Sequence, residues 1–385
     1  MSSTLPPRAG VVVIGGGVVG LSTAYHLARQ GVPDVVLVDR APFGSGSTCK
    51  AAGGVRAQFS DEINIRLGQH SLRTFERFVE ELGQEIDFHQ VGYLFLLDND
   101  ADVATFEQSV RLQNSLGVPS RMLTPAEAQR LSPIVSVDGI RAAAFSPQDG
   151  HCTPESVVLG YANAARRAGA RLVSGCPATG IEVQDGRIRA VQTAAGRIET
   201  DTVVCAAGAW SQEVGTWAGV SLPVEPLRRQ ILVTEPIQGL QRDMPMTIDF
   251  STSFYFHNEG PGMLIGMSDP HETHGFKLSR GEEWMPGLIE AMERRAPALT
   301  EAGIASGWAG LYEDTPDHNG LVGEAAEVGR FLYCTGFSGH GFLLGPALGE
   351  VMTDLVLGRE PMVDVSGFDA SRFAVSGTRP EINIV

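Results

Sequence analysis

Three glycines near the start of the chain have the spacing of a phosphate-binding turn. Gly15, Gly17 and Gly20 follow the order G-x-G-x-x-G, which permits a tight turn, a close approach of the backbone to a pyrophosphate, and close packing of the next helix. The apolar run 11–14 before them predicts a strand buried on both faces of a parallel sheet. The helix expected after the turn, as far as about Gln30, directs its free N–H groups and its positive dipole end at the phosphates.

An acidic residue stands where such a site needs one. A second buried strand is expected over 35–38, and it ends at Asp39, about 20 residues after the last glycine. A carboxylate at this distance accepts hydrogen bonds from the hydroxyls of an adenosine ribose. The alternative is an ordinary turn with Asp39 on the surface. The strand, the helix and the acid together favour a dinucleotide site.

Length and composition limit the classes of protein to which the chain can belong. A chain of 385 residues usually forms two domains, and 43% hydrophobic with 19% charged residues is typical of a globular protein. The net charge of -16 argues against nucleic acid as a partner, because the phosphates would be repelled. No apolar run is long enough for a membrane span, and the short polar N-terminus leaves no room for a signal peptide. The five cysteines form no C-x-x-C pair, which predicts reduced thiols and a cytoplasmic location.

The glycine- and serine-rich loop after Asp39 adds candidate ligand-binding residues. Ser47 and Thr48 are suited to hold phosphate or ribose oxygens. Arg56 has a planar guanidinium that can grip a carboxylate with two hydrogen bonds. A solvated surface arginine is the alternative, and the loop alone does not decide between them.

The remaining pattern predicts alternating helices and strands. Helices are expected over 63–82, 105–116, 124–131, 154–168 and 346–357. Strands are expected over 91–97, 171–173, 202–206, 230–234, 247–250, 254–257, 263–267 and 331–334. The stretch 181–210, which contains the buried strand 202–206, is expected to form a meander with turns at Asp185-Gly186 and Ala195-Gly196. Proline and glycine between the strands of 222–308 predict an antiparallel sheet that carries Tyr255. The acidic run at 98–102 lacks the glycine and glutamate of a calcium loop, and His271 with His274 lacks the partners of a zinc site, so no metal is expected.

Two further segments point to the same ligand. The strand over 202–206 ends in Ala207, Gly208 and Trp210, where small residues let a ligand lie against the backbone. Near the C-terminus a tight glycine loop over 336–341 carries His340 before another helix. His340 between two glycines favours a functional role over that of a core histidine. Two glycine turns and a small-residue strand end suggest one extended ligand held from several sides.

Five separated motifs carry a resemblance to a known family. The N-terminal fingerprint, the GSTCKAAGGVRAQF loop, VVCAAGAW, the TPD at 315–317 and GFSGHGF together resemble the D-amino-acid oxidase and sarcosine oxidase family of flavoproteins. GGVRAQF, PLRRQI and GMSDP are similar to the β-subunits of heterotetrameric sarcosine oxidase and to dye-linked proline dehydrogenases. The resemblance covers almost the whole chain. It implies an α/β fold with a Rossmann-like FAD-binding domain (GR2-type) and an inserted α+β substrate domain that contains an antiparallel sheet. The implied FAD-binding segments are 1–85, 150–221 and 309–385, and the substrate segments are 86–149 and 222–308.

The resemblance also implies roles for individual residues. Arg56 would anchor the substrate carboxylate, with Arg228 or Arg229 as the alternative anchor. Tyr255 and His340 would border the reacting carbon. The cofactor-binding residues would be Gly15, Gly17, Val18, Gly20, Asp39, Arg40, Ser47, Thr48, Ala178, Ala207, Gly208, Trp210, Gly339, His340, Gly341 and Phe342. N–H groups and the helix dipole at the loop 339–342 would stabilise negative charge on the reduced flavin.

The reaction that the resemblance implies is oxidation of a C–N bond to an imine by hydride transfer to flavin N5. The substrate would be a small amino acid or secondary amine, such as a sarcosine-, N-alkyl amino acid- or proline-like compound. The alternatives are an oxidase of primary amino acids, of the glycine or D-amino-acid type, and a flavin subunit of a larger electron-transfer complex. The electron acceptor would be oxygen, a quinone or a partner protein, and the resemblance includes proteins that are subunits of a hetero-oligomer, which is one expectation for this chain. The sequence does not name the amine.

Departures from the family pattern are also informative. Gly310 stands where monomeric sarcosine oxidases attach FAD through a cysteine, so non-covalent FAD is expected. Leu343 and Leu264 stand where those oxidases carry lysines, and the lysine at the second place speeds the reaction with oxygen. Pro154 stands where the heterotetrameric β-subunit attaches FMN through a histidine, so a second flavin is not expected.

Overall fold

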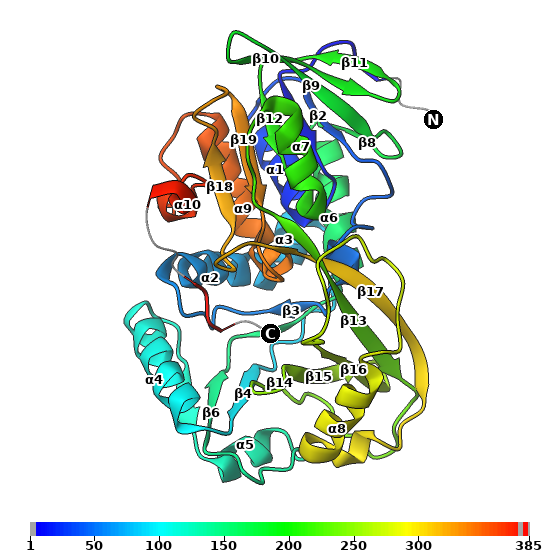
Figure 1. Cartoon of the computed structure of the whole chain (residues 1–385), viewed down its shortest axis with the longest axis vertical. Coiled ribbons are helices and arrows are strands. Elements are labelled where there is room, and N and C mark those ends of the chain that lie inside the picture. Colours follow the sequence, from blue (N-terminus) through cyan, green and yellow to red (C-terminus); the bar gives the residue numbers. More distant parts are fainter. Residues whose placement is uncertain (1–4, 376–379, 384–385) are drawn as a thin grey trace.

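The computed structural model describes residues 5–375 and 380–383. Figure 1 shows two halves stacked along the long axis of the molecule, the upper around a six-stranded sheet and the lower around an eight-stranded sheet. Strands β13 (Glu225–Thr234) and β17 (Ile304–Asp314) run from the junction of the halves into the lower one (Figure 1). The chain therefore has a mixed α/β architecture in which each half has its own sheet.

The six-stranded sheet carries the first glycine turn. Its strands are, in sheet order, β18 (Leu321–Glu324), β19 (Phe331–Thr335), β12 (Val203–Cys205), β1 (Val11–Ile14), β2 (Val35–Val38) and β8 (Arg171–Val173). All neighbouring pairs are parallel except β18 with β19. Val11 and Val13 of β1 belong to one apolar core, and Val12 and Ile14 belong to another. The expectation that this strand is buried on both faces is thus confirmed.

Helices cover both faces of this sheet. One face packs against α1 (Val18–Arg29), α6 (Pro154–Arg167) and α9 (Gly341–Val356), with α2 (Glu62–Glu76) packed on α9. The other face packs against α7 (Ser211–Ala218) and the meander of β9 (Ala178–Gln184), β10 (Arg187–Thr193) and β11 (Gly196–Glu199). The meander expected from the Asp-Gly and Ala-Gly turns forms an antiparallel three-stranded sheet. The strand expected over 202–206 does not join it, because β12 pairs in parallel with β1 and β19 in the six-stranded sheet.

The eight-stranded sheet forms the lower half. Its strands are, in sheet order, β17, β13, β16 (Gly262–Met267), β15 (Phe254–Glu259), β14 (Met246–Asp249), β4 (Tyr93–Leu97), β6 (Ala142–Ser146) and β5 (Arg121–Leu123). The antiparallel prediction holds for every pair within the described strands except β14 with β4, which is parallel. No short hairpin joins these two strands, because β4 comes from a distant part of the sequence, so hairpin geometry does not fix their relative direction. Helices α4 (Asp100–Ser115), α5 (Pro125–Leu131) and α8 (Met285–Arg295) accompany this sheet.

Several elements differ in their bounds from the sequence expectation. Helix α4 begins at Asp100 because the Asn99 side chain accepts the N–H of Asp102, so the acidic run is the first turn of a helix. The helix expected over 63–82 divides at Arg77 into α2 and α3 (Phe78–Leu82). Helix α9 begins at Gly341, and Pro346 lies inside it. The expected start at Pro346 was wrong because a buried helix surrounded by packing tolerates a proline that an isolated helix would not.

Shorter elements complete the chain. Strands β3 (Gly54–Val55) and β7 (Gly150–His151) pair at the junction of the halves, and α10 (Arg372–Val375) follows the last core segment. In 5–375 and 380–383, no helix has the length and apolar character needed to cross a membrane. The predicted domain segments 1–85 and 309–385 include positions 1–4, 376–379 and 384–385, which lie outside the described residues.

Candidate active site

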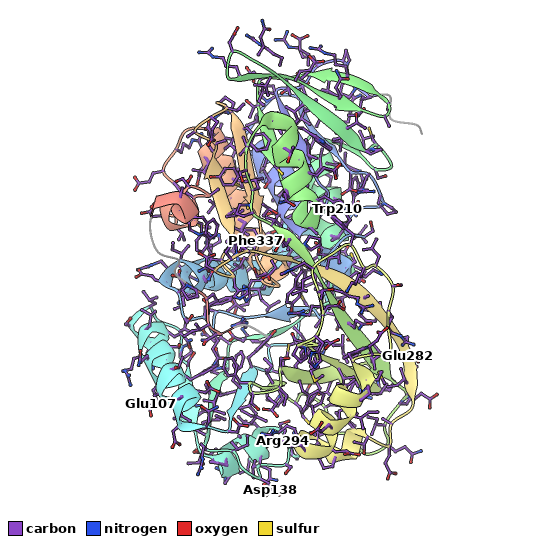
Figure 2. The ribbon with its side chains drawn as sticks, viewed as in Figure 1. Glu107, Asp138, Trp210, Glu282, Arg294 and Phe337 are labelled. Carbon is purple, nitrogen blue, oxygen red and sulfur yellow. The ribbon has the colours of Figure 1, made fainter. Side chains whose placement is uncertain are left out.

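One large cavity lies between the two halves. It has a volume of about 540 Å³ and is lined at the carboxyl ends of β1, β2, β12 and β19, the end where ligands bind in open parallel sheets. In Figure 2, Trp210 and Phe337 lie in the upper half, while Asp138 and Arg294 lie in the lower half. Trp210 belongs to the cavity wall.

The structure brings nearly all of the predicted site residues together. The residues that line the cavity are Gly15, Gly17, Val18, Asp39, Arg40, Ser47, Thr48, Arg56, Ala178, Ala207, Gly208, Trp210, Tyr255, Gly339, His340, Gly341 and Phe342. Gly20 alone of the predicted set does not line it. A Cβ at Gly20 would lie 1.9 Å from the carbonyl oxygen of Gly15, so this glycine serves the packing of α1 against the turn. The roles of these residues toward a ligand remain predictions.

The first glycine turn leaves a helix terminus open to the cavity. Gly15 has φ +111°, and a Cβ there would lie 2.1 Å from the carbonyl oxygen of Ala206, so only glycine fits. Helix α1 has Gly17 as its N-cap and no side-chain cap, while the N–H of Val18 donates to Thr48 Oγ1 at 3.1 Å. An anionic group is favoured at such a helix N-terminus.

Asp39 lies beside this turn. Its carboxylate accepts the N–H of Gly16 at 2.6 Å and the N–H of Ala41 at 2.8 Å. Burial raises the pKa of Asp39 from its ordinary value. The Arg40 guanidinium lies 5.2 Å from the ring centre of Trp210, and both residues line the same cavity as Asp39. Acceptor oxygens and an aromatic platform are thus found together, as an adenosine would require.

The second glycine turn is arranged in a similar way. Gly339 has φ +100°, and a Cβ there would lie 2.5 Å from the ring of Tyr312. Helix α9 follows with His340 as its N-cap and no side-chain cap. The ring of His340 stands edge-on to Phe59 at 5.1 Å, and burial holds the pKa of His340 well below its usual value, so the imidazole is neutral.

Glu313 is a buried acid on β17 that packs against this turn and that sequence reasoning missed. Its carboxylate accepts the hydroxyl of Thr335 and the N–H of Gly336, each at 2.8 Å, and burial raises its pKa. It lines the cavity close to the start of α9. The available signal was its place two residues before the TPD motif.

The wall opposite the turns is one face of the eight-stranded sheet. The side chains that it contributes are Tyr93 of β4, Met246 and Ile248 of β14, Tyr255 of β15, Arg229 and Ile231 of β13, and Tyr312 of β17. Gly266 pairs with both Tyr255 and Ile231, and a Cβ there would lie 2.3 Å from the Tyr255 hydroxyl. The missing side chain therefore lets the ring of Tyr255 lie across β16 toward β13. Of these residues, sequence reasoning singled out Tyr255 as a site residue and named Arg229, together with Arg228, only as an alternative carboxylate anchor.

Arg56 lies between the two halves and is almost completely buried. One terminal nitrogen donates to the carbonyl oxygen of Gln58, and the other donates to the carbonyl oxygen of Asn383 at 2.6 Å. The guanidinium lies 4.2 Å from the ring centre of Phe59. Nearby, Asp149 Oδ1 accepts the N–H of Ala57 at 3.0 Å, and burial raises the pKa of Asp149 to about 7. Arg56 lines the cavity, and it also holds the segment around residue 383 in place.

Lys50 and Gly310 meet at the cavity wall. A Cβ at Gly310 would lie 2.6 Å from the Cβ of Lys50, so the space that a cysteine side chain would need is already taken. The carbonyl oxygen of Lys50 accepts the indole N–H of Trp308 at 3.0 Å. Lys50 is a cation of the cavity wall that sequence reasoning did not single out. Its position within the GSTCKAAGG loop was the only signal.

Alternative sites gain no support from the described part of the chain. Within it, no group of three or more His, Cys, Asp or Glu side chains could hold a metal ion. His274 instead contacts Asp314 at 3.1 Å and Glu225 at 3.4 Å. The five cysteines are free thiols.

The cavity fits a flavin dinucleotide. It is long enough to be lined by two glycine turns, it receives two helix N-termini without side-chain caps, and an acid lies at the end of the second strand. A parallel sheet with these features defines a dinucleotide-binding fold of the kind that holds NAD or FAD.

Comparison with known proteins decides between NAD and FAD as the cofactor. The family model of FAD dependent oxidoreductases designated DAO matches residues 10–355. The chain therefore belongs to this family, and its cofactor is FAD. The resemblance to the D-amino-acid oxidase and sarcosine oxidase family is confirmed.

Individual relatives agree with this assignment. Mitochondrial sarcosine dehydrogenase of Homo sapiens is 33% identical over 389 residues, covering 97% of this chain and 42% of that protein. Mitochondrial dimethylglycine dehydrogenase of Mus musculus is 32% identical, covering 95% of this chain and 44% of that protein. The crystal structure of L-proline dehydrogenase from P. horikoshii superposes with a TM-score of 0.91 at 34% identity, covering 97% of this chain and all of that one. The chain spans less than half the length of the two mitochondrial relatives.

Proposed function

We propose that this chain oxidises the C–N bond of a small amino acid whose nitrogen is a secondary or tertiary amine. The observation that carries the proposal is the cavity in which the glycine turns of the nucleotide fold face arginine and tyrosine side chains of the eight-stranded sheet. The names of three relatives support the same chemistry, because sarcosine, dimethylglycine and proline are all amino acids with alkylated nitrogen. Bound FAD would supply the acceptor for a hydride from the carbon beside that nitrogen, which leaves an iminium cation; where the nitrogen carries a proton, its loss gives the imine.

FAD binding and substrate binding are assigned to different segments of the chain, as in the predicted domains. We assign 1–85, 150–221 and 309–385 to FAD binding, and 86–149 and 222–308 to an inserted substrate domain. The six-stranded sheet lies entirely in the first set, which supports this division. Strand β17 spans residue 309, so the boundary falls within a strand that belongs to the wall of the cavity.

The protein groups must bind the substrate and keep its amine neutral. Arg56, Tyr255 and His340 border the substrate in this proposal, and the cofactor-binding residues named above hold FAD. Arg56, Arg229 and Lys50 place positive charge on the cavity wall, which disfavours a substrate ammonium and so lowers the pKa of the bound amine. A neutral amine has the lone pair that the oxidation requires. The tyrosine rings and Ile248 exclude water from the reacting carbon.

FAD is bound without a covalent link in this proposal. Gly310 offers no nucleophile, and its contact with Lys50 leaves no space for one. Acid or heat should therefore release all of the flavin into the supernatant. Flavin that stayed with the precipitated polypeptide would contradict the assignment.

The test of the proposed function is anaerobic bleaching of the flavin absorbance. Purified yellow protein is mixed with N-methylglycine, N,N-dimethylglycine, proline, glycine and D-alanine, with dithionite as the control for a reducible flavin. Bleaching by the first three substrates, and weakly or not at all by the last two, is the expected result. Bleaching by glycine or D-alanine alone would establish the primary amino-acid alternative. No bleaching by any amine would favour a flavin subunit of a larger electron-transfer assembly and would overturn the proposal.

A further inference from the structure

Strand β13 places two neighbouring arginines on opposite faces of the sheet. Arg229 and Ile231, two residues apart, both line the cavity. Arg228 points to the other face, where its guanidinium donates to the carboxylate of Glu272 and to the carbonyl oxygen of Ser279. Because side chains alternate along a strand, the sequence RRQ directs only its second arginine into the site.

The guanidinium of Arg229 has unused hydrogen-bonding capacity. One terminal nitrogen, Nη1, donates to the carbonyl oxygen of Arg228 at a long 3.3 Å. Its Nε is buried and has no hydrogen-bond partner within the described residues. No ion pair of Arg229 with an acidic residue occurs anywhere in 5–375 or 380–383. A buried donor without a partner costs free energy, so a ligand that accepts from it is favoured.

The surroundings fix the orientation of this guanidinium. It lies 4.9 Å from the ring centre of Tyr312, which holds the plane by stacking. The edge formed by Nε and Nη2 is the one that makes no hydrogen bond within the described chain. Such an edge matches the two oxygens of a carboxylate in a bidentate contact. The tyrosine rings of Tyr312 and Tyr255 flank the same part of the wall.

Arg56, unlike Arg229, has no terminal nitrogen that is free to bind a ligand. Both of its terminal nitrogens already donate to backbone carbonyl oxygens, of Gln58 and of Asn383. The face of its guanidinium is covered by Phe59. It contributes positive potential to the cavity, but a ligand would have to displace existing hydrogen bonds to be gripped by it.

We propose that Arg229 makes the direct bidentate contact with the carboxylate of the substrate, and that Arg56 acts on it only through its charge. This deepens the proposed function and rests on it, because it names an amino acid rather than a simple amine as the substrate class. A carboxylate at Arg229 satisfies the buried Nε and neutralises a charge that has no ion-pair partner in the described chain. An amine without a carboxylate would leave the buried Nε without an acceptor and the guanidinium charge without a counter-ion, so such amines are poor substrates.

The experiment measures carboxylate binding by the oxidised holoprotein, without turnover. The protein is titrated with propionate and with propionamide, its neutral isostere, and the shift of the flavin absorbance gives each dissociation constant. Arg229→Met should weaken propionate binding by roughly thirtyfold or more, as for other lost charge-pair contacts, and leave propionamide unchanged. Arg229→Lys should recover part of the lost propionate affinity, because lysine keeps the positive charge but cannot donate two parallel hydrogen bonds as a guanidinium does. Arg228→Lys is the matched control on the opposite face and should change propionate binding by less than about threefold.

The outcomes separate this inference from the proposed function. Each variant must keep the wild-type ratio of flavin to protein, and Arg229→Gln serves if the methionine variant does not fold. Unchanged propionate binding in an Arg229 variant that retains FAD would overturn the inference, as would loss of binding in Arg56→Met alone. With a bleaching substrate in hand, a raised KM at nearly constant kcat for Arg229→Lys supports the inference. If propionate binding depends on Arg229 while no amine bleaches the wild type, the proposed function fails and the carboxylate site stands.

Discussion

The two ends of the cavity are built by different means. The nucleotide end is built mainly on the backbone of one stretch, 11–40, with short segments around Thr48 and Trp210 beside it, and its shape depends on glycines where a Cβ would collide. The opposite end is made of side chains from strands that lie far apart in the sequence, from Tyr93 to Tyr312. A backbone site binds a group common to many cofactors, whereas a side-chain site decides which substrate is accepted. Substitutions at the two ends should therefore fail in different ways.

The largest effect is expected at the nucleotide end. Gly15→Ala places a Cβ 2.1 Å from the carbonyl oxygen of Ala206 at a φ of +111°, so strain and overpacking together should cost roughly 2 to 6 kcal/mol. The protein should lose its flavin absorbance. Gly31→Ala is the matched control, because Gly31 has φ +80° but no atom within 4 Å of the added Cβ. The Gly31→Ala variant should lose about 1 to 2 kcal/mol of stability and keep its FAD. Equal flavin loss in the two variants would mean that the strained backbone alone, and not the collision of the new Cβ with Ala206, causes the loss.

A pH effect on stability is expected at the side-chain end. Burial raises the folded-state pKa of Asp149 to about 7, above the ordinary value of 3.8, so folding favours the protonated acid. Its stabilising contribution is complete below about pH 4 and is lost as the pH rises through 7, by roughly 1 to 4 kcal/mol. Asp149→Asn cannot ionise and should escape this loss. Urea unfolding at several pH values should show the variant gaining stability relative to the wild type as the pH rises.

The exposed Asp100 at the start of α4 supplies a control for this measurement. Asp100→Asn removes the same charge without burial. Its profile shows how the loss of one exposed negative charge affects the unfolding measurement. A stability difference for Asp149→Asn that does not change with pH would mean that this carboxyl does not titrate in the range.

A smaller effect concerns the electron acceptor. Leu264, at the place where the related oxidases carry a lysine, is buried on β16 and supplies no charge. Flavin reduced anaerobically by substrate should therefore be reoxidised faster by a dye or quinone than by aerated buffer. If air reoxidises it rapidly with stoichiometric peroxide, Lys50 is the cation to remove. Lys50→Met should then slow the oxygen reaction by about tenfold. His340, the cation first suggested by its place in the glycine loop, is buried and neutral and supplies no such charge.

The smallest effect is expected for a single hydroxyl. Tyr255→Phe keeps the ring that lies across Gly266 and removes only one hydrogen-bonding group. A change of roughly 0.5 to 1.5 kcal/mol in kcat/KM, about two- to tenfold, is expected. Tyr161→Phe makes the same change in a fully buried tyrosine outside the cavity and should leave kcat/KM unaltered. A hundredfold loss in Tyr255→Phe would instead assign its hydroxyl a direct chemical role.

The nucleotide end was predictable because its information is local. A strand, three spaced glycines, a helix and an acid lie within one short stretch, and the structure places them as expected. The side-chain end of the cavity was not predictable from the sequence, because its composition depends on which strands become neighbours in the eight-stranded sheet. Nothing near Tyr93 predicts that β4 lies parallel to β14, and nothing in PLRRQI alone states that the second arginine faces the cavity. Gly266 could be interpreted only once its two strand partners were known.

The contact between Gly310 and Lys50 has a consequence for engineering. A designer who wished to tether the flavin would introduce a cysteine at position 310, yet this single change drives the new Cβ to 2.6 Å from that of Lys50. The neighbour must be made smaller first, for example by Lys50→Gly, before the thiol has room. The intermediate with only the first change remains an untethered protein with one cation fewer. Conversion from non-covalent to covalent flavin binding therefore takes two substitutions, first at Lys50 and then at Gly310. Their order is set by the space available and not by the reactivity of the thiol.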